Sequence, residues 1–333
     1  MSERKKKLPV SVPIFAAYHQ QGSCGVAMAA NPGFYNFYLH DAVDMMCGRN
    51  FLHGMTTPEF YVCNTAFGQN PCVDQRTINL KFVMDLSHEL IRRMIDMDYY
   101  VYFDGIDDFY VEGKSWYGKR HFSHDGMICG YDDEKQTYDL FAYDENWVYR
   151  VFSTSQSSFY RGLSAGAPLG KYGNFVGLKV RDGGIAFDVK LVYQRLEKYL
   201  DSDFEKYPTD GIGTVYGTVV HDYLCIYLER LRDGVIPYER MDWRAMRVLW
   251  EHKKCMLDRI KSAEAAIGAG VELSSEYEAV VRSADLVRML YTRYHLKKDD
   301  RLPDAIIERI RSIKEDEKRI LTKLCERIKR FSE

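Results

Sequence analysis

Three residues in the first half of the chain could together perform nucleophilic catalysis. Cys24 offers a thiol, His124 an imidazole and Asp144 a carboxylate, in this order along the sequence. The thiolate is the reactive form of cysteine, so catalysis needs a base that takes the thiol proton and a polar group that orients the base. The three residues therefore predict a cysteine-dependent enzyme in which the substrate is held for a time on Cys24.

His124 and Asp144 frame a predicted β-hairpin. His124 opens an apolar strand, and the turn signal Gly130-Tyr131-Asp132-Asp133 begins six residues later. The returning strand ends at Asp144, so pairing of the strands would place the imidazole and the carboxylate side by side. His121 is the alternative base, and Asn146 is the alternative orienting residue because an amide can do the same work.

Cys24 is expected at the start of a helix. Gly25-Val26-Ala27-Met28 fits a first helical turn, and the free N–H groups of such a turn stabilise a thiolate. Asn31-Pro32 should interrupt this helix, since proline disfavours helical geometry in the residue before it. Cys47 is the alternative nucleophile. The carboxylates of Asp107, Asp108 and Asp125 either lie in exposed turns or bind an incoming ammonium group.

Composition excludes several classes of protein. The chain has 333 residues, 46% of them hydrophobic, with a net charge of −2, so it can bury a large core and has no overall field that attracts nucleic acid or an anionic membrane. Its eight cysteines form no CxxC pair, so neither a metal site nor a disulfide framework is expected. No segment has the roughly 20 apolar residues of a spanning helix, and a cytoplasmic location is expected.

The elements around these residues predict an α+β protein of two parts. Residues 1–185 combine a helix that ends near Met97, after a cap at Asp85, with several hairpin-connected strands. Residues 186–333 have helical periodicity. The clearest stripe there comprises Ile306, Ile307, Ile310, Ile313, Ile320, Leu321, Leu324, Ile328 and Phe331.

The pattern Gln-x-x-x-Cys-Gly-x-Ala, followed by His-x5-Gly-Tyr-Asp-Asp and a later Asp, resembles the papain-like cysteine-protease fold of bacterial leader-processing peptidases. Segments 31–38, 99–101 and 121–126 are similar to papain-fold transferases of bacterial natural-product (nonribosomal peptide) assembly. Within that group these segments resemble the amide-forming transferase of closthioamide biosynthesis, and the butirosin acyltransferase is a more distant resemblance. The resemblance covers about the first 185 residues and implies an antiparallel sheet.

The resemblance implies a role for each matched residue. Cys24 would be the nucleophile, His124 the general base and Asp144 the orienting residue of a catalytic triad. A glutamine before the nucleophile would help to bind the oxyanion, and Gln20 is the candidate. The match departs from the family here, because the family glutamine generally lies six residues before the cysteine, where this chain has Tyr18.

The resemblance also implies a reaction. An acyl or peptidyl group would pass from a phosphopantetheinyl thioester on a carrier protein to Cys24, and then to a primary amine as an amide. The alternatives are a peptidase or amidase with water as acceptor, and a catalytically silent papain-fold binding protein. The basic segment Lys114–Arg120 could contact an acidic carrier protein. The helical part would act as a lid, a carrier-protein dock or a homodimer interface, and no cofactor, nucleic acid or membrane partner is expected.

Overall fold

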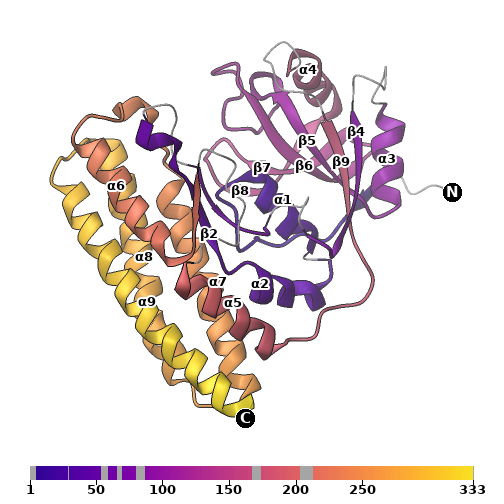
Figure 1. Cartoon of the computed structure of the whole chain (residues 1–333). Helices are drawn as coiled ribbons and strands as arrows, with labels where there is room; N and C mark the ends of the chain where they lie inside the picture. Colours follow the sequence, from indigo (N-terminus) through magenta and orange to yellow (C-terminus); the bar gives the residue numbers. More distant parts are fainter. Residues whose placement is uncertain are drawn as a thin grey trace. The chain divides into compact units, whose positions relative to one another are not determined.

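The computed structural model divides the chain into two compact units (Figure 1). The first comprises residues 1–34 and 65–184, and the second residues 35–64 and 185–333. The main boundary lies within one residue of that expected from the sequence, but segment 35–64 belongs to the second unit, which the sequence did not indicate. The residues described are 5–28, 30–53, 59–65, 70–79, 87–166, 174–202 and 213–332.

An antiparallel sheet of seven strands forms the centre of the first unit (Figure 1). Its order is β4-β9-β5-β6-β7-β8, and β1 pairs with one end of β6. The strand bounds are β1 Lys5–Lys7, β4 Val73–Asn79, β5 Tyr100–Asp107, β6 Ser123–Asp132, β7 Thr137–Tyr143, β8 Tyr149–Ser155 and β9 Asn174–Val180. The expected α+β class with an antiparallel sheet is confirmed.

The predicted hairpin is present as β6 and β7. Met127 pairs with Phe141, and Ile128 with Leu140. On its other side β6 pairs with β5, where Ile106 lies opposite His124. A bulge in β5 between Phe103 and Ile106 shifts this register. As a result, the residues that follow Ile106 lie beside the first residues of β6.

In the described part of this unit, the sheet is accompanied by the helices α1 His19–Met28, α3 His88–Asp96 and α4 Gln156–Gly166. The hydroxyl of Ser87 caps α3 by accepting from the Leu90 N–H, while the expected cap Asp85 lies outside the described residues. Helix α4 packs closely on β5, because Gly166 has no Cβ that would meet the Gly105 carbonyl.

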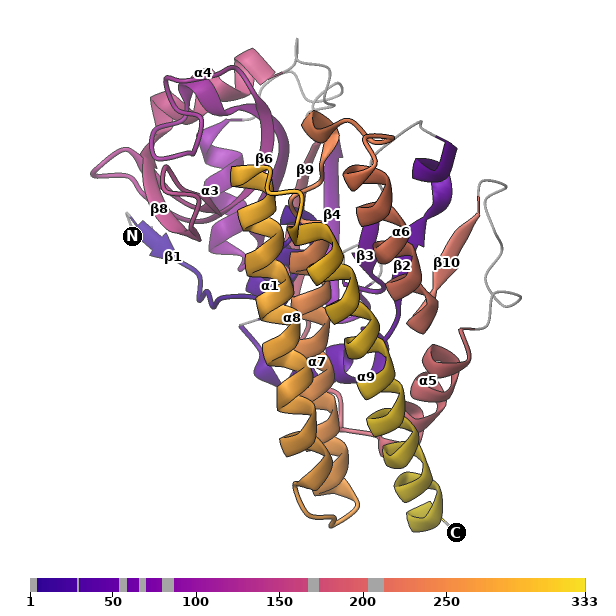
Figure 2. The same ribbon diagram turned by 90° about the vertical axis from the view of Figure 1, so that its left-hand side faces the viewer.

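The second unit is mainly helical, as expected for the C-terminal region. Figure 2 shows its long helices α7, α8 and α9 side by side. Its helices are α2 Tyr35–Asp41, α5 Val189–Asp201, α6 Val220–Arg232, α7 Ala245–Ala266, α8 Glu272–Lys297 and α9 Leu302–Ser332. A small antiparallel sheet is formed by β10 Thr214–Tyr216, β2 Met45–Gly48 and β3 Phe60–Val62.

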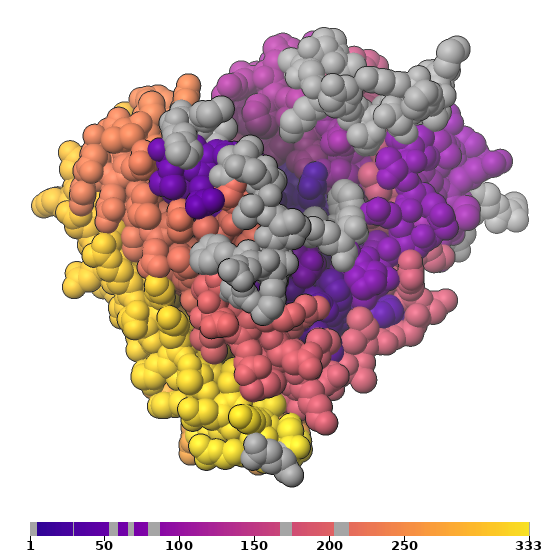
Figure 3. Space-filling view, in the orientation of Figure 1, coloured from indigo at the N-terminus to yellow at the C-terminus, as the bar shows by residue number. Residues whose placement is uncertain are grey.

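The apolar stripe of α9 forms part of the core of this unit. Its isoleucines and leucines from Ile306 to Ile328 are buried, but Phe331 is exposed and does not belong to it. The opposite face of α9, yellow in Figure 3, carries exposed lysine, arginine and glutamate side chains. Within the part of the chain that the structure describes, no helix has the length and apolar character needed to cross a bilayer.

Candidate functional site

His124 is held by a buried carboxylate at the end of β5. Its Nδ1 lies 2.9 Å from Oδ2 of Asp108, and Asp108 is fully buried. The other oxygen of Asp108 forms an ion pair of 2.6 Å with the ammonium of Lys114, which is also fully buried. The pairing of Ile106 with His124 explains the contact, because Asp108 follows two residues later. This arrangement fixes the orientation of the imidazole.

Burial and charge together set the protonation of this pair. Burial raises the pKa of Asp108, but the Lys114 ammonium and the hydrogen bond to His124 outweigh burial and leave that pKa below its usual value. Burial, and then the positive charge of Lys114, lower the pKa of His124 to about 4. At neutral pH the pair is therefore a carboxylate and a neutral imidazole, whose Nε2 has an available lone pair when Nδ1 carries the proton.

A second histidine lies against the first. The ring of His19, at the start of α1, stacks on His124 with a centroid distance of 4.4 Å. Its Nδ1 lies 2.6 Å from Oδ1 of Asp125, whose other oxygen accepts from the hydroxyl of Tyr102 at 2.6 Å. Nε2 of His19 is buried and has no hydrogen-bond partner among the described residues. We call His19, Asp108, Lys114, His124 and Asp125 the His–Asp cluster.

Two tyrosines and a glycine fix the position of His19. Tyr143 and Tyr149 stack near its ring at centroid distances of 5.0 and 5.2 Å. Tyr149 reaches this place because α1 carries Gly22, where a Cβ would lie 2.6 Å from the tyrosine ring. The small residue Gly22 thus allows the close packing that the sequence predicts for this helix. The side chain that packs there is the Tyr149 ring, which stacks against His19.

Cys24 lies in the middle of α1, so the expectation that it begins this helix is wrong. Its side chain is fully buried, and Asn70 Nδ2 lies 3.2 Å from Sγ. In an ideal helix, residue 24 lies about 7.5 Å along the axis from residue 19 and is rotated by about 140°. The α1 residue that stacks on His124 is His19, five residues before Cys24.

Asp144 lies where the hairpin predicts, directly after β7, but its carboxylate faces other partners. Oδ1 accepts from the N–H groups of Asn146 and Val148 at 2.8 and 2.9 Å, and Oδ2 pairs with Arg150. Asp144 therefore closes the β7–β8 turn. The prediction that it orients His124 is wrong, since Asp108 does so. Asn146, the alternative, is exposed and donates its backbone N–H to the same turn.

The remaining candidates take other places. His121 has its own carboxylate, Asp107, at 2.8 Å, but its side chain is 55% exposed. Cys47 lies in β2 of the second unit, where burial raises the pKa of its thiol well above the usual range and disfavours the reactive thiolate. Gln20 is exposed and hydrogen-bonds with Tyr102, so it lies at the margin of the His–Asp cluster.

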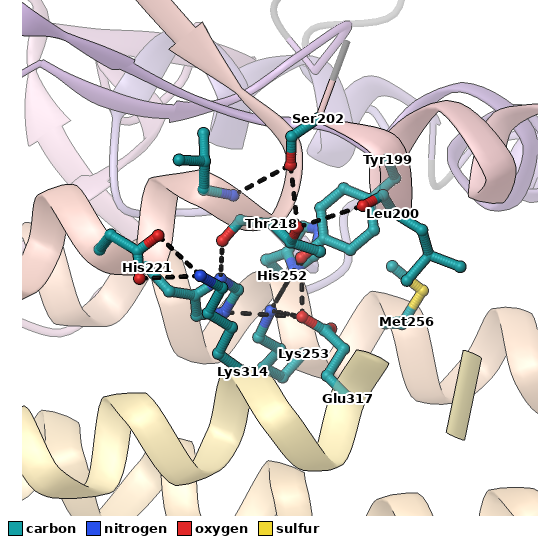
Figure 4. A network of polar contacts seen from close by, with 12 residues as sticks. Tyr199, Leu200, Ser202, Thr218, His221, His252, Lys253, Met256, Lys314 and Glu317 are labelled. Carbon is teal, nitrogen blue, oxygen red and sulfur yellow. Dashed lines mark hydrogen bonds and ion pairs between the residues drawn. The ribbon is translucent and has the colours of Figure 1, made fainter. Parts of the chain in front are cut away.

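A second polar cluster lies inside the helical unit (Figure 4). Glu317 accepts from Lys253 Nζ and from the Tyr199 hydroxyl, both at 2.7 Å, and His221 Nε2 lies 3.5 Å away. Tyr277 also donates to this carboxylate. All these side chains are fully buried, so no substrate reaches them without unfolding. They bond to one another and to neighbours such as His252 and the Thr218 carbonyl, which is the pattern of a structural network.

Among the described residues, the His–Asp cluster is the candidate functional site, because His124 and Asp125 each keep 18% of their side chains exposed. A neutral imidazole beside carboxylates can accept a proton or bind a metal ion. No protein-family model matches the chain, and no curated protein matches it.

Proposed function

We propose that the chain is an enzyme that transfers an acyl group to a primary amine, in which His124 activates the attacking amine and Asp108 is its positioning residue. The observation that carries the proposal is the 2.9 Å contact between His124 Nδ1 and Asp108 Oδ2. A buried carboxylate that binds one nitrogen of an imidazole fixes its tautomer, and the other nitrogen then faces the substrate.

The reaction joins an acyl thioester and an amine. The amine nitrogen attacks the carbonyl carbon, the C–N bond forms and the C–S bond breaks. The proton lost by the amine passes to the His–Asp cluster and returns to the leaving thiolate, so the products are an amide and a thiol. The resemblance to papain-fold transferases, and a hairpin that opens with His124, support acyl transfer.

The amine attacks the donor thioester directly in this proposal. The resemblance assigns a covalent thioester to Cys24, but that thiol is fully buried in the middle of α1. His19 occupies the helix position beside His124 and stacks on its ring. The acyl group therefore moves in one step, without an acyl-enzyme on Cys24.

An aromatic surface next to His124 supports an apolar acyl substrate. Phe122 contacts the His124 ring edge-on at a centroid distance of 5.3 Å. Trp116 packs on Trp147 at 5.2 Å, and the Arg120 guanidinium lies over Trp116. Both Phe122 and Trp147 are exposed, although large aromatic side chains are usually buried. Exposed aromatic rings beside a catalytic group suit an acyl chain or an aromatic donor.

The basic segment Lys114–Arg120 offers less positive charge to an acidic carrier protein than the sequence indicated. Lys114 is buried and paired with Asp108, so only Lys119 and Arg120 of Lys114–Arg120 offer positive charge at the surface. These two side chains remain the candidates for binding the phosphate of a phosphopantetheinyl donor or an acidic carrier protein.

The test compares two histidines that each pair with a carboxylate. The purified chain is mixed with acyl thioesters of N-acetylcysteamine and a primary amine, and amide and free acid are measured by mass spectrometry. We expect amide from the wild type, a loss of roughly 100-fold or more in His124→Gln, and little change in His121→Gln. Free acid as the only product would identify a hydrolase. No turnover of any thioester would contradict the proposal and favour a binding protein.

A further inference from the structure

We propose that His19, His124 and Asp125 bind a divalent transition-metal ion such as Zn²⁺. Each offers one ligand atom, and these atoms all lie within 4.8 Å of one another. Two imidazoles and one carboxylate form a ligand set that catalytic zinc sites use, with a further position left open. The inference rests on the proposed function because it concerns the same reaction at the same site. While Nε2 of His124 binds a metal ion it cannot accept a proton, so in the metal-loaded protein the ion, and not the imidazole, would activate the substrates.

The contact between His124 and Asp108 matches the surroundings of a metal ligand. A histidine that binds a metal through one nitrogen usually donates the N–H of the other to a carboxylate, which fixes the ring. Asp108 holds Nδ1 of His124, so Nε2 is the nitrogen available to a metal ion. That nitrogen lies 3.9 Å from Oδ1 of Asp125. The gap is larger than a hydrogen bond and leaves room for an ion between the two atoms.

His19 offers a nitrogen to the same carboxylate oxygen of Asp125. Its side chain is only 4% exposed, and Nε2 has no hydrogen-bond partner within the described ranges. The other ring nitrogen, Nδ1, lies 2.6 Å from Oδ1 of Asp125, and a metal ion bound to both atoms would take the place of that contact. Stacking with Tyr143 and Tyr149 holds the ring next to Asp125. The ring is thus fixed and desolvated before any ligand arrives.

The charges nearby also suit a dication. Asp125 is anchored by the hydroxyl of Tyr102 at 2.6 Å, which orients its second oxygen. Lys114 carries positive charge close to the site, but its ammonium binds Asp108 and the backbone oxygen of Asp125. The Asp108 carboxylate therefore offsets that charge. A metal ion here would polarise the carbonyl of the donor thioester as a Lewis acid.

The experiment measures metal binding directly. Protein stripped with a chelator is titrated with Co²⁺, whose visible absorption reports coordination by protein ligands, and Zn²⁺ is then added to displace it. We expect one equivalent of Co²⁺ per chain and at least tenfold weaker binding in His19→Gln. The matched control is His121→Gln, which should bind as the wild type does. No Co²⁺ binding, or equal binding in His19→Gln, would overturn the inference.

Two further variants keep the test decisive if His19→Gln does not fold. Asp108→Asn should weaken Co²⁺ binding by about 10–100-fold without removing a ligand. His19→Cys should still bind Co²⁺ and add a sulfur-to-cobalt charge-transfer band. Circular dichroism checks that each variant is folded. Absence of the new band in folded, metal-loaded His19→Cys would show that residue 19 is not a ligand.

The failure of this inference differs from the failure of the proposed function. If chelator-treated protein binds no Co²⁺ and still forms amide at the full rate, the metal site is refuted and acyl transfer stands. If Co²⁺ binds with the expected dependence on His19 but no thioester is consumed, the metal site stands and acyl transfer is refuted.

Discussion

Two adjacent aspartates give two neighbouring histidines very different surroundings. Asp107 binds His121 and Asp108 binds His124, at 2.8 and 2.9 Å. The first histidine is mostly in solvent, whereas the second is stacked on His19 and near the buried Lys114. A His–Asp contact alone thus does not identify a catalytic group. Burial makes the difference, since electrostatic interactions are stronger where water is excluded.

The role of Cys24 can be tested at this scale. Because its thiol is buried away from the helix start, we predict that Cys24→Ala keeps amide formation within about threefold of the wild type. Intact-protein mass spectrometry after mixing with acyl thioester should show no adduct on residue 24. An adduct that forms on the wild type, is missing in Cys24→Ala and is discharged by amine would establish the covalent mechanism instead.

Helix α1 and the hairpin differ in how far the sequence predicts them. The hairpin has alternating apolar residues and a clear turn, and its strands are found as expected. The helix after Cys24 is also predicted and ends near Asn31-Pro32 as expected, but its true start lies earlier than the sequence indicates. Ala17 and Tyr18 before His19 are not capping residues, so no local signal marks that start.

The partner of His124 is missed for a different reason. Asp108 lies beside His124 because β5 pairs with β6 through a bulge. Such a register depends on contacts between strands, and the spacing of residues in one segment cannot supply it. The sequence shows only that acidic residues occur near His121 and His124. From the sequence alone, these acidic residues are expected in exposed turns or at a site that binds an ammonium group.

Packing of α1 against β8 gives a prediction at the scale of elements. Gly22→Ala would place a methyl group 2.6 Å from the Tyr149 ring, so the ring and then His19 must move. Overpacking of this kind typically costs about 1–3 kcal/mol. We expect a lower thermal midpoint and a loss of amide formation. Gly270→Ala is the control, since its Cβ would meet no atom within 4 Å. Equal effects of both changes would contradict this account of Gly22.

For the whole molecule, the sequence predicts the change from strands to helices near residue 185 but not the inclusion of segment 35–64 in the helical unit. Segment 35–64 belongs to the helical unit because it contacts residues that are far away in the sequence. Arg259 in α7, for example, donates to the backbone oxygens of Leu39 and Ala42. The buried network around Glu317 is equally invisible in the sequence, because helical periodicity reports apolar faces and does not show which charged residues pair inside them.

This network makes the stability of the helical unit depend on pH. Burial and then the Lys253 ammonium lower the pKa of His221 from 6.5 to about 3. A histidine with a lowered pKa in the folded state binds fewer protons there than in the unfolded chain. Its contribution to stability is thus complete above about pH 6.5 and is lost as the pH falls toward 3.

The corresponding measurement is urea denaturation followed by far-ultraviolet circular dichroism at pH 7.5 and 5. We predict a lower free energy of unfolding at pH 5 and a smaller difference between the two pH values in His221→Gln. His295, which is exposed and lies near the end of α8, provides the control His295→Gln. The same pH dependence in wild type and His221→Gln would show that His221 does not contribute.

The central claim is that Asp108 positions His124 for catalysis. The most direct test replaces each of the two adjacent aspartates separately by asparagine. We would measure kcat/KM for amide formation in Asp108→Asn and Asp107→Asn, with circular dichroism to confirm folding. Loss of the carboxylate that fixes the His124 tautomer should lower kcat/KM by roughly 100-fold or more, whereas Asp107→Asn should stay within a few-fold of the wild type. Equal losses in both variants, or full activity in folded Asp108→Asn, would contradict the account.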